Sequence, residues 1–435
     1  MRALRHGLSL RGPPGPNGYG AIMRPLEHPD WVRRLNYFGE AGDPRRIIGL
    51  DAGELLDVAR SGTGLSDLGE GEWPGWTETY ERQLSSIDAE SNLHLLGRLL
   101  TRSEVLRVLQ TWLRLQQLWS QTPAIAATPI ERPVFVVGPP RTGTTILLEL
   151  LALDPQLRAP IAYEALYPLA SSGDTAERLK LSQSEQELWA DIHPPFLSMH
   201  ELASNLPCEC VHFLMYDFSG PYWGMIYDAP SFTGWQLEHL ETLARVYKLH
   251  RRMLQTFQHE APDPSARHWL LKSPFHVSNL PALFGEYPDA KVIHTHRDPE
   301  KFLASLVSIL SALRFMRSDA VDVAALAAAM EFTYKMFLDG AIEARESGQV
   351  PEEQIVDSHF TDLMADPVAA MRGIYEQLEL EWPDDHDSAI KRYLTIKPKD
   401  KHGAHGYSLS DVGLDPESVR RSFEPYVAHY RIAKE

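Results

Sequence analysis

A glycine-bearing loop, GPPRTGTT at residues 138–145, carries the most specific chemical signal in the sequence. A short apolar run rich in β-branched residues (133–138) precedes it, and the apolar run ILLELLAL follows it, which predicts a strand, a loop and a helix in that order. Glycines let successive backbone N–H groups point into one concavity, and the start of a helix adds the positive end of its dipole. The pattern therefore predicts a phosphate-binding loop.

The loop differs from that of nucleotide triphosphatases at one position. Their loop has the form G-x-x-x-x-G-K-[ST], in which the lysine reaches the β- and γ-phosphates. Here Thr144 stands at the lysine position, and the basic residue is Arg141 inside the loop. Because neither a triphosphate clamp nor an obvious magnesium partner remains, the sequence disfavours ATP hydrolysis. It favours a nucleotide with a short 5′-phosphate chain that needs no metal.

The loop resembles the signature of the sulfotransferase superfamily, roughly G-x-P-[RK]-[ST]-G-T-T, and the resemblance covers roughly residues 133–413. The helical N-terminal region and the loop ending LYPLAS look like the bacterial-type branch of that superfamily. The resemblance implies transfer of a sulfuryl group from 3′-phosphoadenosine 5′-phosphosulfate (PAPS), without a metal, to a hydroxyl or amine of a small-molecule acceptor. It also implies which loop residues hold the 5′-phosphosulfate end of PAPS. They are Gly138, Pro140, Arg141, Thr142, Gly143, Thr144 and Thr145.

The same resemblance implies a separate site for the 3′-phosphate of PAPS. Family members carry an arginine at a strand end and a serine eight residues later, and here Arg297 follows the run KVIHTH with Ser305 eight positions on. Eight residues are slightly over two helical turns, so both side chains can converge on one phosphate. The basic stretch 397–413 resembles the C-terminal loop that covers the nucleotide, although a solvated run of lysines is the alternative. In that loop the expected contacts are Lys401, His402 and Gly403.

Four side chains are candidates for the chemistry itself. Sulfuryl transfer needs a base for the acceptor proton and positive charge near the leaving oxygen. Arg141 and Lys272, which ends the run WLLK, are expected to stabilise that oxygen. Glu164 is the favoured base, because branches of the family that use glutamate place it at a similar distance after the loop. His276 is the second choice, and a structural pair with an arginine is the alternative role of Glu164.

Two other functions stay open at this level. One is a P-loop nucleotide phosphotransferase or ATPase, against which the missing loop lysine and the Arg297–Ser305 pair count. The other is a nucleotide-binding protein that has lost catalysis.

The elements that must position these residues indicate an α/β fold. Strand-like runs at 133–138, 268–274, 290–299 and, more weakly, 354–360 alternate with helical patterns. This predicts a P-loop-type parallel sheet flanked by helices, with the site at the carboxyl ends of the strands. Three regions are expected: a loose arm (1–30), a helical N-terminal region (31–130) and the sulfotransferase α/β domain (131–435) with its covering loop near 397–413.

Composition narrows the class of protein further. The chain has 435 residues and a formal net charge of −17, which argues against a general nucleic-acid binder. Its two cysteines, Cys208 and Cys210, are too close to form a disulfide readily and by themselves make no zinc site, which suits a reducing cytoplasm. We expect no signal peptide and no membrane span, and leave a homo-oligomer open.

An aromatic segment at 213–235 bears on the acceptor. Its eight Phe, Tyr and Trp residues would suit the wall of a pocket for a small apolar or aromatic molecule, or equally a packed core under the acceptor loop.

Overall fold

A five-stranded parallel sheet organises the chain, in a computed structural model that describes residues 26–169, 174–396 and 408–435. The strand order is β2-β3-β1-β4-β5, with the strand that precedes the phosphate loop in the centre. The four expected strands are confirmed. The strands are β1 (Val134–Val137), β2 (Leu157–Arg158), β3 (His268–Lys272), β4 (Lys291–His296) and β5 (Ile355–His359). The two-residue β2 was not predicted, because it is too short to show a periodicity.

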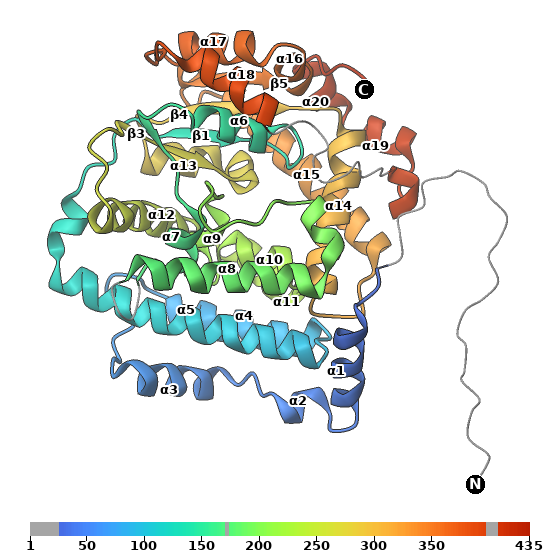
Figure 1. Cartoon of the computed structure of the whole chain (residues 1–435). Coiled ribbons are helices and arrows are strands. Elements are labelled where there is room, and N and C mark those ends of the chain that lie inside the picture. The colour runs from blue at the N-terminus through green and yellow to red at the C-terminus, as the bar shows by residue number, and fades with distance from the viewer. Residues whose placement is uncertain (1–25, 170–173, 397–407) are drawn as a thin grey trace.

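Helices cover both faces of the sheet (Figure 1). Val134 and Val136 of β1 belong to a core with α6, α17 and α18, whereas Phe135 and Val137 face the larger core with α12–α15. This period-2 alternation is what a central strand buried on both sides requires. The helices are α6 (Thr144–Leu151), α12 (Glu241–Glu260), α13 (Leu280–Glu286), α14 (Pro299–Phe315), α15 (Val323–Glu346), α16 (Phe360–Ala365), α17 (Pro367–Gln377) and α18 (His386–Ile396).

The N-terminal region is helical, and the described residues before β1 contain no strand. Figure 1 shows its long helix α5 next to a middle layer of helices, which separates it from the sheet. The N-terminal helices are α1 (Asp30–Glu40), α2 (Pro44–Ile47), α3 (Ala52–Thr63), α4 (Trp76–Glu90) and α5 (Leu95–Gln121). The middle layer holds α7 (Ala162–Leu166), α8 (Thr175–Ile192), α9 (Val211–Leu214), α10 (Pro221–Ile226) and α11 (Pro230–Glu238).

The remaining elements are short. The C-terminal helices are α19 (Pro416–Ser422) and α20 (Glu424–His429), and the 3₁₀ turns are η1 (Pro123–Ala127), η2 (Pro194–Ser198), η3 (Pro274–Asn279), η4 (Glu352–Gln354) and η5 (Leu409–Val412). Across the described ranges, none of the helices is long and apolar enough to cross a membrane. The expected arm lies almost wholly outside the described residues, as do residues 397–407 of the covering loop.

The aromatic segment at 213–235 is packed core. Phe218 is 1% exposed and contacts Trp76 and Tyr80 of α4, and the Trp76 indole N–H donates to the Tyr216 carbonyl at 2.9 Å. These side chains bind the middle layer to the N-terminal helices. Of the two interpretations, the core is therefore the one that the structure supports.

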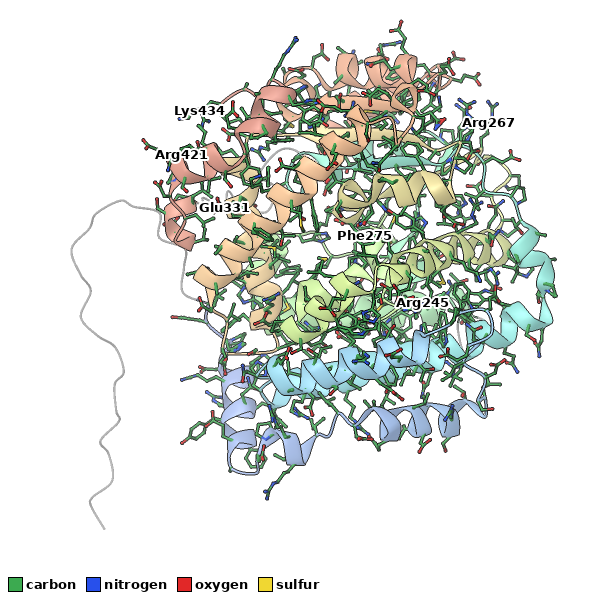
Figure 2. The ribbon with its side chains drawn as sticks, turned by 180° about the vertical axis from the view of Figure 1, so that it is seen from behind. Arg245, Arg267, Phe275, Glu331, Arg421 and Lys434 are labelled. Carbon is green, nitrogen blue, oxygen red and sulfur yellow. The ribbon has the colours of Figure 1, made fainter. Side chains whose placement is uncertain are left out.

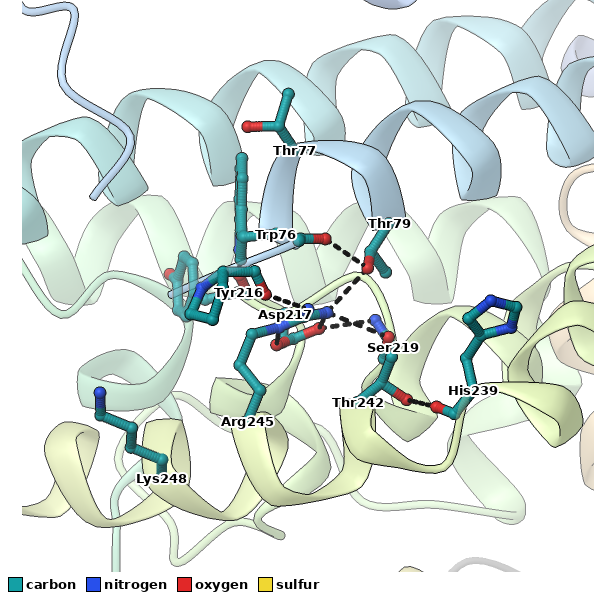
Figure 3. A network of polar contacts seen from close by, with 12 residues as sticks. Trp76, Thr77, Thr79, Tyr216, Asp217, Ser219, His239, Thr242, Arg245 and Lys248 are labelled. Atoms are coloured by element: carbon teal, nitrogen blue, oxygen red, sulfur yellow. Dashed lines mark hydrogen bonds and ion pairs between the residues drawn. The ribbon is translucent and has the colours of Figure 1, made fainter. Parts of the chain in front are cut away.

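A buried ion pair joins α12 to the middle layer, and its arginine also contacts the N-terminal helices. Arg245 of α12 pairs with Asp217 at 2.7 Å and also donates to Thr79 Oγ1 and to the Pro74 carbonyl (Figure 3). In the view from behind, Arg245 lies beside the N-terminal helices and Phe275 lies nearer the sheet (Figure 2). Because both charges are buried, each depends on its partner.

Candidate active site

The phosphate loop lies between β1 and α6, at the carboxyl edge of the sheet. Gly138 has a φ of +137°, and a Cβ on it would lie 2.3 Å from Thr295 Oγ1 of β4, so only glycine permits this close approach. Thr142 Oγ1 donates to the Pro139 carbonyl at 2.7 Å and holds the curl from inside. Among the described residues no side chain caps α6, which begins after Gly143. Its first backbone N–H groups therefore suit an anion.

Lys272 connects the loop to the neighbouring strand. It ends β3, pairs in register with Val136 of β1, and is 2% exposed. Its Nζ donates to Thr145 Oγ1 at 3.0 Å and to Glu209 Oε1 at 2.5 Å. An ammonium from β3 thus stands beside a loop that lacks a lysine of its own.

Glu209, just before α9, is the carboxylate that the structure places at this ammonium. Its side chain is 19% exposed. Burial opposes its ionisation, but the Lys272 ammonium, through its charge and a hydrogen bond, holds the pKa of Glu209 below its usual range, with smaller effects of His200 and His212. Glu209 is therefore ionised at neutral pH.

The charge of Glu209 also acts on the side chains of His200 and Tyr334. Burial, the largest effect, lowers the pKa of His200 to about 4, so this imidazole is neutral at pH 7. Burial and the Glu209 charge raise the pKa of the Tyr334 hydroxyl, which comes from α15. Next to His200, the Met199 carbonyl accepts from Arg141 Nη1 at 3.4 Å, so the segment after η2 contacts the loop.

Glu164, the base expected from the sequence, lies in α7 with both oxygens engaged. Oε2 accepts from the Ile161 N–H at the start of its own helix at 3.2 Å, and Oε1 accepts from Arg158 Nη2 at 3.4 Å. Arg158 also donates to the carbonyls of Phe257 and Ala261. These contacts are those of a structural pair with an arginine, which the sequence analysis gave as the alternative role of Glu164.

His276, the second choice, lies in the core under β1 and β3. It is fully buried, with Nδ1 2.9 Å from Tyr247 Oη, and its ring contacts Phe135 and His250.

Arg297 follows β4, as expected, and lies beside the loop. Its Nη1 donates to the Arg141 carbonyl at 2.8 Å, and its guanidinium lies 3.8 Å from the centre of the Phe360 ring. The Glu435 carboxylate accepts from Nε at 2.8 Å and from Nη2 at 2.9 Å. A bidentate carboxylate thus occupies the guanidinium edge that would meet a phosphate.

Ser305, the expected partner of Arg297, is half-buried on α14. The other expected 3′-phosphate contacts lie outside the described residues. They are Lys401, His402 and Gly403.

Sequence reasoning missed Glu209. Its signal is an acidic residue inside the largely apolar stretch PCECVHF, which predicts a buried charge with a partner. The sequence alone could not identify Lys272 as that partner, because Lys272 lies 63 residues away.

Comparisons with known proteins agree with this geometry. The family model described as "Sulfotransferase family" matches residues 133–384, more than half of the chain, including β1, the phosphate loop, Lys272 and Arg297. The chain belongs to the sulfotransferase family. The omega-hydroxy-beta-dihydromenaquinone-9 sulfotransferase Stf3 of Mycobacterium tuberculosis is 26% identical over 277 residues. That match covers 60% of this chain and 66% of the relative, slightly under two thirds of its length.

Two solved sulfotransferases share the fold over most of this family member. STF9 from Mycobacterium avium superposes with a TM-score of 0.77 at 24% identity, covering 88% of this chain and 97% of its own. STF1 from Mycobacterium tuberculosis superposes with a TM-score of 0.71 at 27% identity, covering 86% of this chain and 98% of its own. Both matches extend well beyond the 133–384 stretch, so the helical N-terminal region is part of the shared architecture.

Proposed function

We propose that this sulfotransferase transfers the sulfuryl group of PAPS to a hydroxyl group of an apolar small molecule. The observation that carries the proposal is the double contact of the Lys272 ammonium with Thr145 of the phosphate loop and with Glu209. It joins a phosphate site, a positive charge and a carboxylate within hydrogen-bond distance. These are the parts that a proton-coupled displacement at sulfur needs.

In the proposed reaction the acceptor oxygen bonds to sulfur while the bond from sulfur to the bridging 5′-phosphate oxygen breaks. Lys272 and Arg141 stabilise the negative charge that grows on the released phosphate. When that phosphate lies at Thr145, Lys272 can bond to it and loosen its hold on Glu209. The freed carboxylate then takes the acceptor proton, so donor binding itself activates the base.

Glu209 takes the role of base in this proposal in place of Glu164 and His276. Glu209 contacts the ammonium at the loop, whereas Glu164 bonds to Arg158 and its own helix start, and His276 is enclosed in the core. A base has to be within hydrogen-bond reach of the acceptor proton, and that criterion favours the residue at the loop.

The acceptor class rests on the relative and on composition. The curated relative Stf3 is named for a menaquinone derivative with a terminal hydroxyl, a long apolar molecule. The net charge of −17 gives no hint of the basic track that an anionic polysaccharide would favour. We therefore place ω-hydroxylated isoprenoid quinones and similar alcohols first among candidate acceptors. A cytoplasmic location stays a prediction from the sequence.

The first experiment tests the donor. The purified protein is titrated by calorimetry with adenosine 3′,5′-bisphosphate, 5′-AMP and ATP with magnesium, and sulfate transfer from PAPS to a hydroxylated isoprenoid and to a hexose is followed by mass spectrometry. We expect binding that needs the 3′-phosphate, and sulfation of the isoprenoid. Preference for ATP with magnesium, and turnover of it, would withdraw the proposal.

The second experiment tests the base with a matched pair of variants. Glu209→Gln is expected to lower turnover by about 10²-fold or more while adenosine 3′,5′-bisphosphate still binds. Glu164→Gln has the same change of charge and size, and is expected to act on thermal stability more than on turnover. The reverse pattern, with turnover lost only in Glu164→Gln, would return the role to that residue.

A further inference from the structure

Two histidines and a cysteine from three separate segments gather in the core under the proposed active site. Cys210 directly precedes α9, His250 lies in α12 and His276 lies in η3. All three are fully buried, and one donor atom of each lies within 4.8 Å of the donor atoms of the other two.

Each of the two imidazoles is oriented by a hydrogen bond between its Nδ1 atom and a tyrosine hydroxyl. His276 Nδ1 lies 2.9 Å from Tyr247 Oη, and His250 Nδ1 lies 2.8 Å from Tyr287 Oη. The Nε2 atom of each ring is buried and has no hydrogen-bond partner among the described residues. When Nδ1–H donates to the tyrosine oxygen, Nε2 carries a free lone pair, which is the arrangement found in histidines that bind a metal.

Buried polar atoms without a partner are costly, and here two of them belong to one cluster with a thiol. We propose that Cys210, His250 and His276 bind one d¹⁰ transition-metal ion, Zn²⁺ or Cu⁺. Thiolate and imidazole are the ligands that both ions prefer. Donors about 2.0–2.3 Å from a tetrahedral ion lie about 3.3–3.6 Å apart, and the donor atoms here lie within 4.8 Å of one another, so they have to approach by no more than about 1.5 Å to bind one ion. On binding, the Cys210 thiol loses its proton to solvent and the sulfur–metal bond forms.

The position of the cluster gives the ion a structural purpose. Cys210 follows Glu209 directly, and His276 lies four residues after Lys272. An ion that ties Cys210 to His276 would hold the two segments that carry the Lys272–Glu209 pair, with His250 fastening both to α12. The inference stands apart from the proposed reaction, because metal content is measured without any substrate.

A second cluster of possible ligands has a different environment. His294, His296 and Asp357 also lie close together, but Arg345 donates to Asp357 at 2.7 Å. The Arg345 guanidinium repels a cation and already neutralises the charge of the Asp357 carboxylate. The cluster at Cys210 has no such cation bound to its donor atoms among the described residues.

The test is the metal content of the full chain, purified without a polyhistidine tag. Elemental analysis is expected to find about one equivalent of zinc or copper. Cys210→Ser should lower it at least about tenfold. The matched control is Cys208→Ser, since Cys208 is also buried and two residues away but outside the cluster, and it should keep the metal.

If Cys210→Ser does not fold, refolding of the wild-type chain with a metal ion still tests the proposed site. The wild-type chain is unfolded with chelator and refolded with Co²⁺, which should give one equivalent of bound ion with a thiolate-to-cobalt absorption band. Less than about a tenth of an equivalent of metal as purified, together with no cobalt uptake on refolding, would overturn the proposal. Equal metal in the Cys210→Ser and wild-type proteins would overturn it as well.

Discussion

The pairing of Arg297 with Glu435 predicts that a single carboxylate limits nucleotide affinity. Arg297 donates from Nε and Nη2 to both oxygens of Glu435, and the two side chains are only 20% and 18% exposed. The same two donors would meet the 3′-phosphate of the nucleotide in the proposed function. Binding therefore has to displace this carboxylate first, and Glu435→Gln removes its charge with little change of shape.

The magnitude follows from the geometry of the pair. Exposed ion pairs contribute about 0–1 kcal/mol, and hydrogen bonds to charged groups about 1.5–3 kcal/mol. A bidentate pair that is mostly buried but lies at the protein surface should contribute a free energy between these two ranges, about 1–2 kcal/mol. Removing it should tighten binding of adenosine 3′,5′-bisphosphate by about five- to thirtyfold. The gain should shrink at high salt, because both partners still touch solvent.

Calorimetric titration of wild type and Glu435→Gln with adenosine 3′,5′-bisphosphate is the assay. The 5′-AMP titration should show little gain, since this nucleotide lacks the 3′-phosphate. Glu417→Gln controls for net charge, because Glu417 is an exposed residue of α19 paired with Arg421. Unchanged or weaker bisphosphate affinity in Glu435→Gln, or an equal gain for 5′-AMP, would refute the competition between carboxylate and phosphate.

Three further predictions concern other parts of the molecule. Lys272→Met should lower kcat about 10²- to 10³-fold in the PAPS assay, because the charge that stabilises the leaving phosphate is gone; a loss below tenfold would contradict that role. Asp217→Asn should lower the free energy of unfolding in urea by about 3–5 kcal/mol, since it leaves Arg245 buried without its counter-charge; the surface variant Asp30→Asn should leave it nearly unchanged, because the ion pairs of Asp30 with Arg33 and Arg34 are exposed. Burial lowers the pKa of His193 to about 4, so its contribution to stability is complete above the unfolded pKa of about 6.5 and is lost as the pH falls toward 4, by about 1.4 kcal/mol per pH unit. His193→Phe should reduce the slope of urea-unfolding free energy against pH in that window by this amount, about 1.4 kcal/mol per pH unit, while other buried histidines such as His200 keep the rest of the slope; an unchanged slope would contradict the assignment.

Local patterns in the sequence sufficed for the phosphate loop and for four of the five strands. A strand buried on both faces shows as a continuous apolar run, and the curl of the loop needs glycine where Gly138 meets Thr295. The same runs placed Lys272 and Arg297 at strand ends, where side chains of parallel sheets meet at one edge. The resemblance to the family rested on these local features, since each motif that carries it is a short stretch of the chain.

The partners of the charged groups were decided by the tertiary structure. Glu164 and Glu209 are both acidic residues in apolar stretches, and only the fold shows that one meets Arg158 and its own helix start while the other meets Lys272. Arg297 and Glu435 are 138 residues apart, so no local pattern could have joined them. The role of a buried charge depends on which opposite charge the fold brings within about 3 Å, because electrostatic interaction falls off with distance in space and not along the chain.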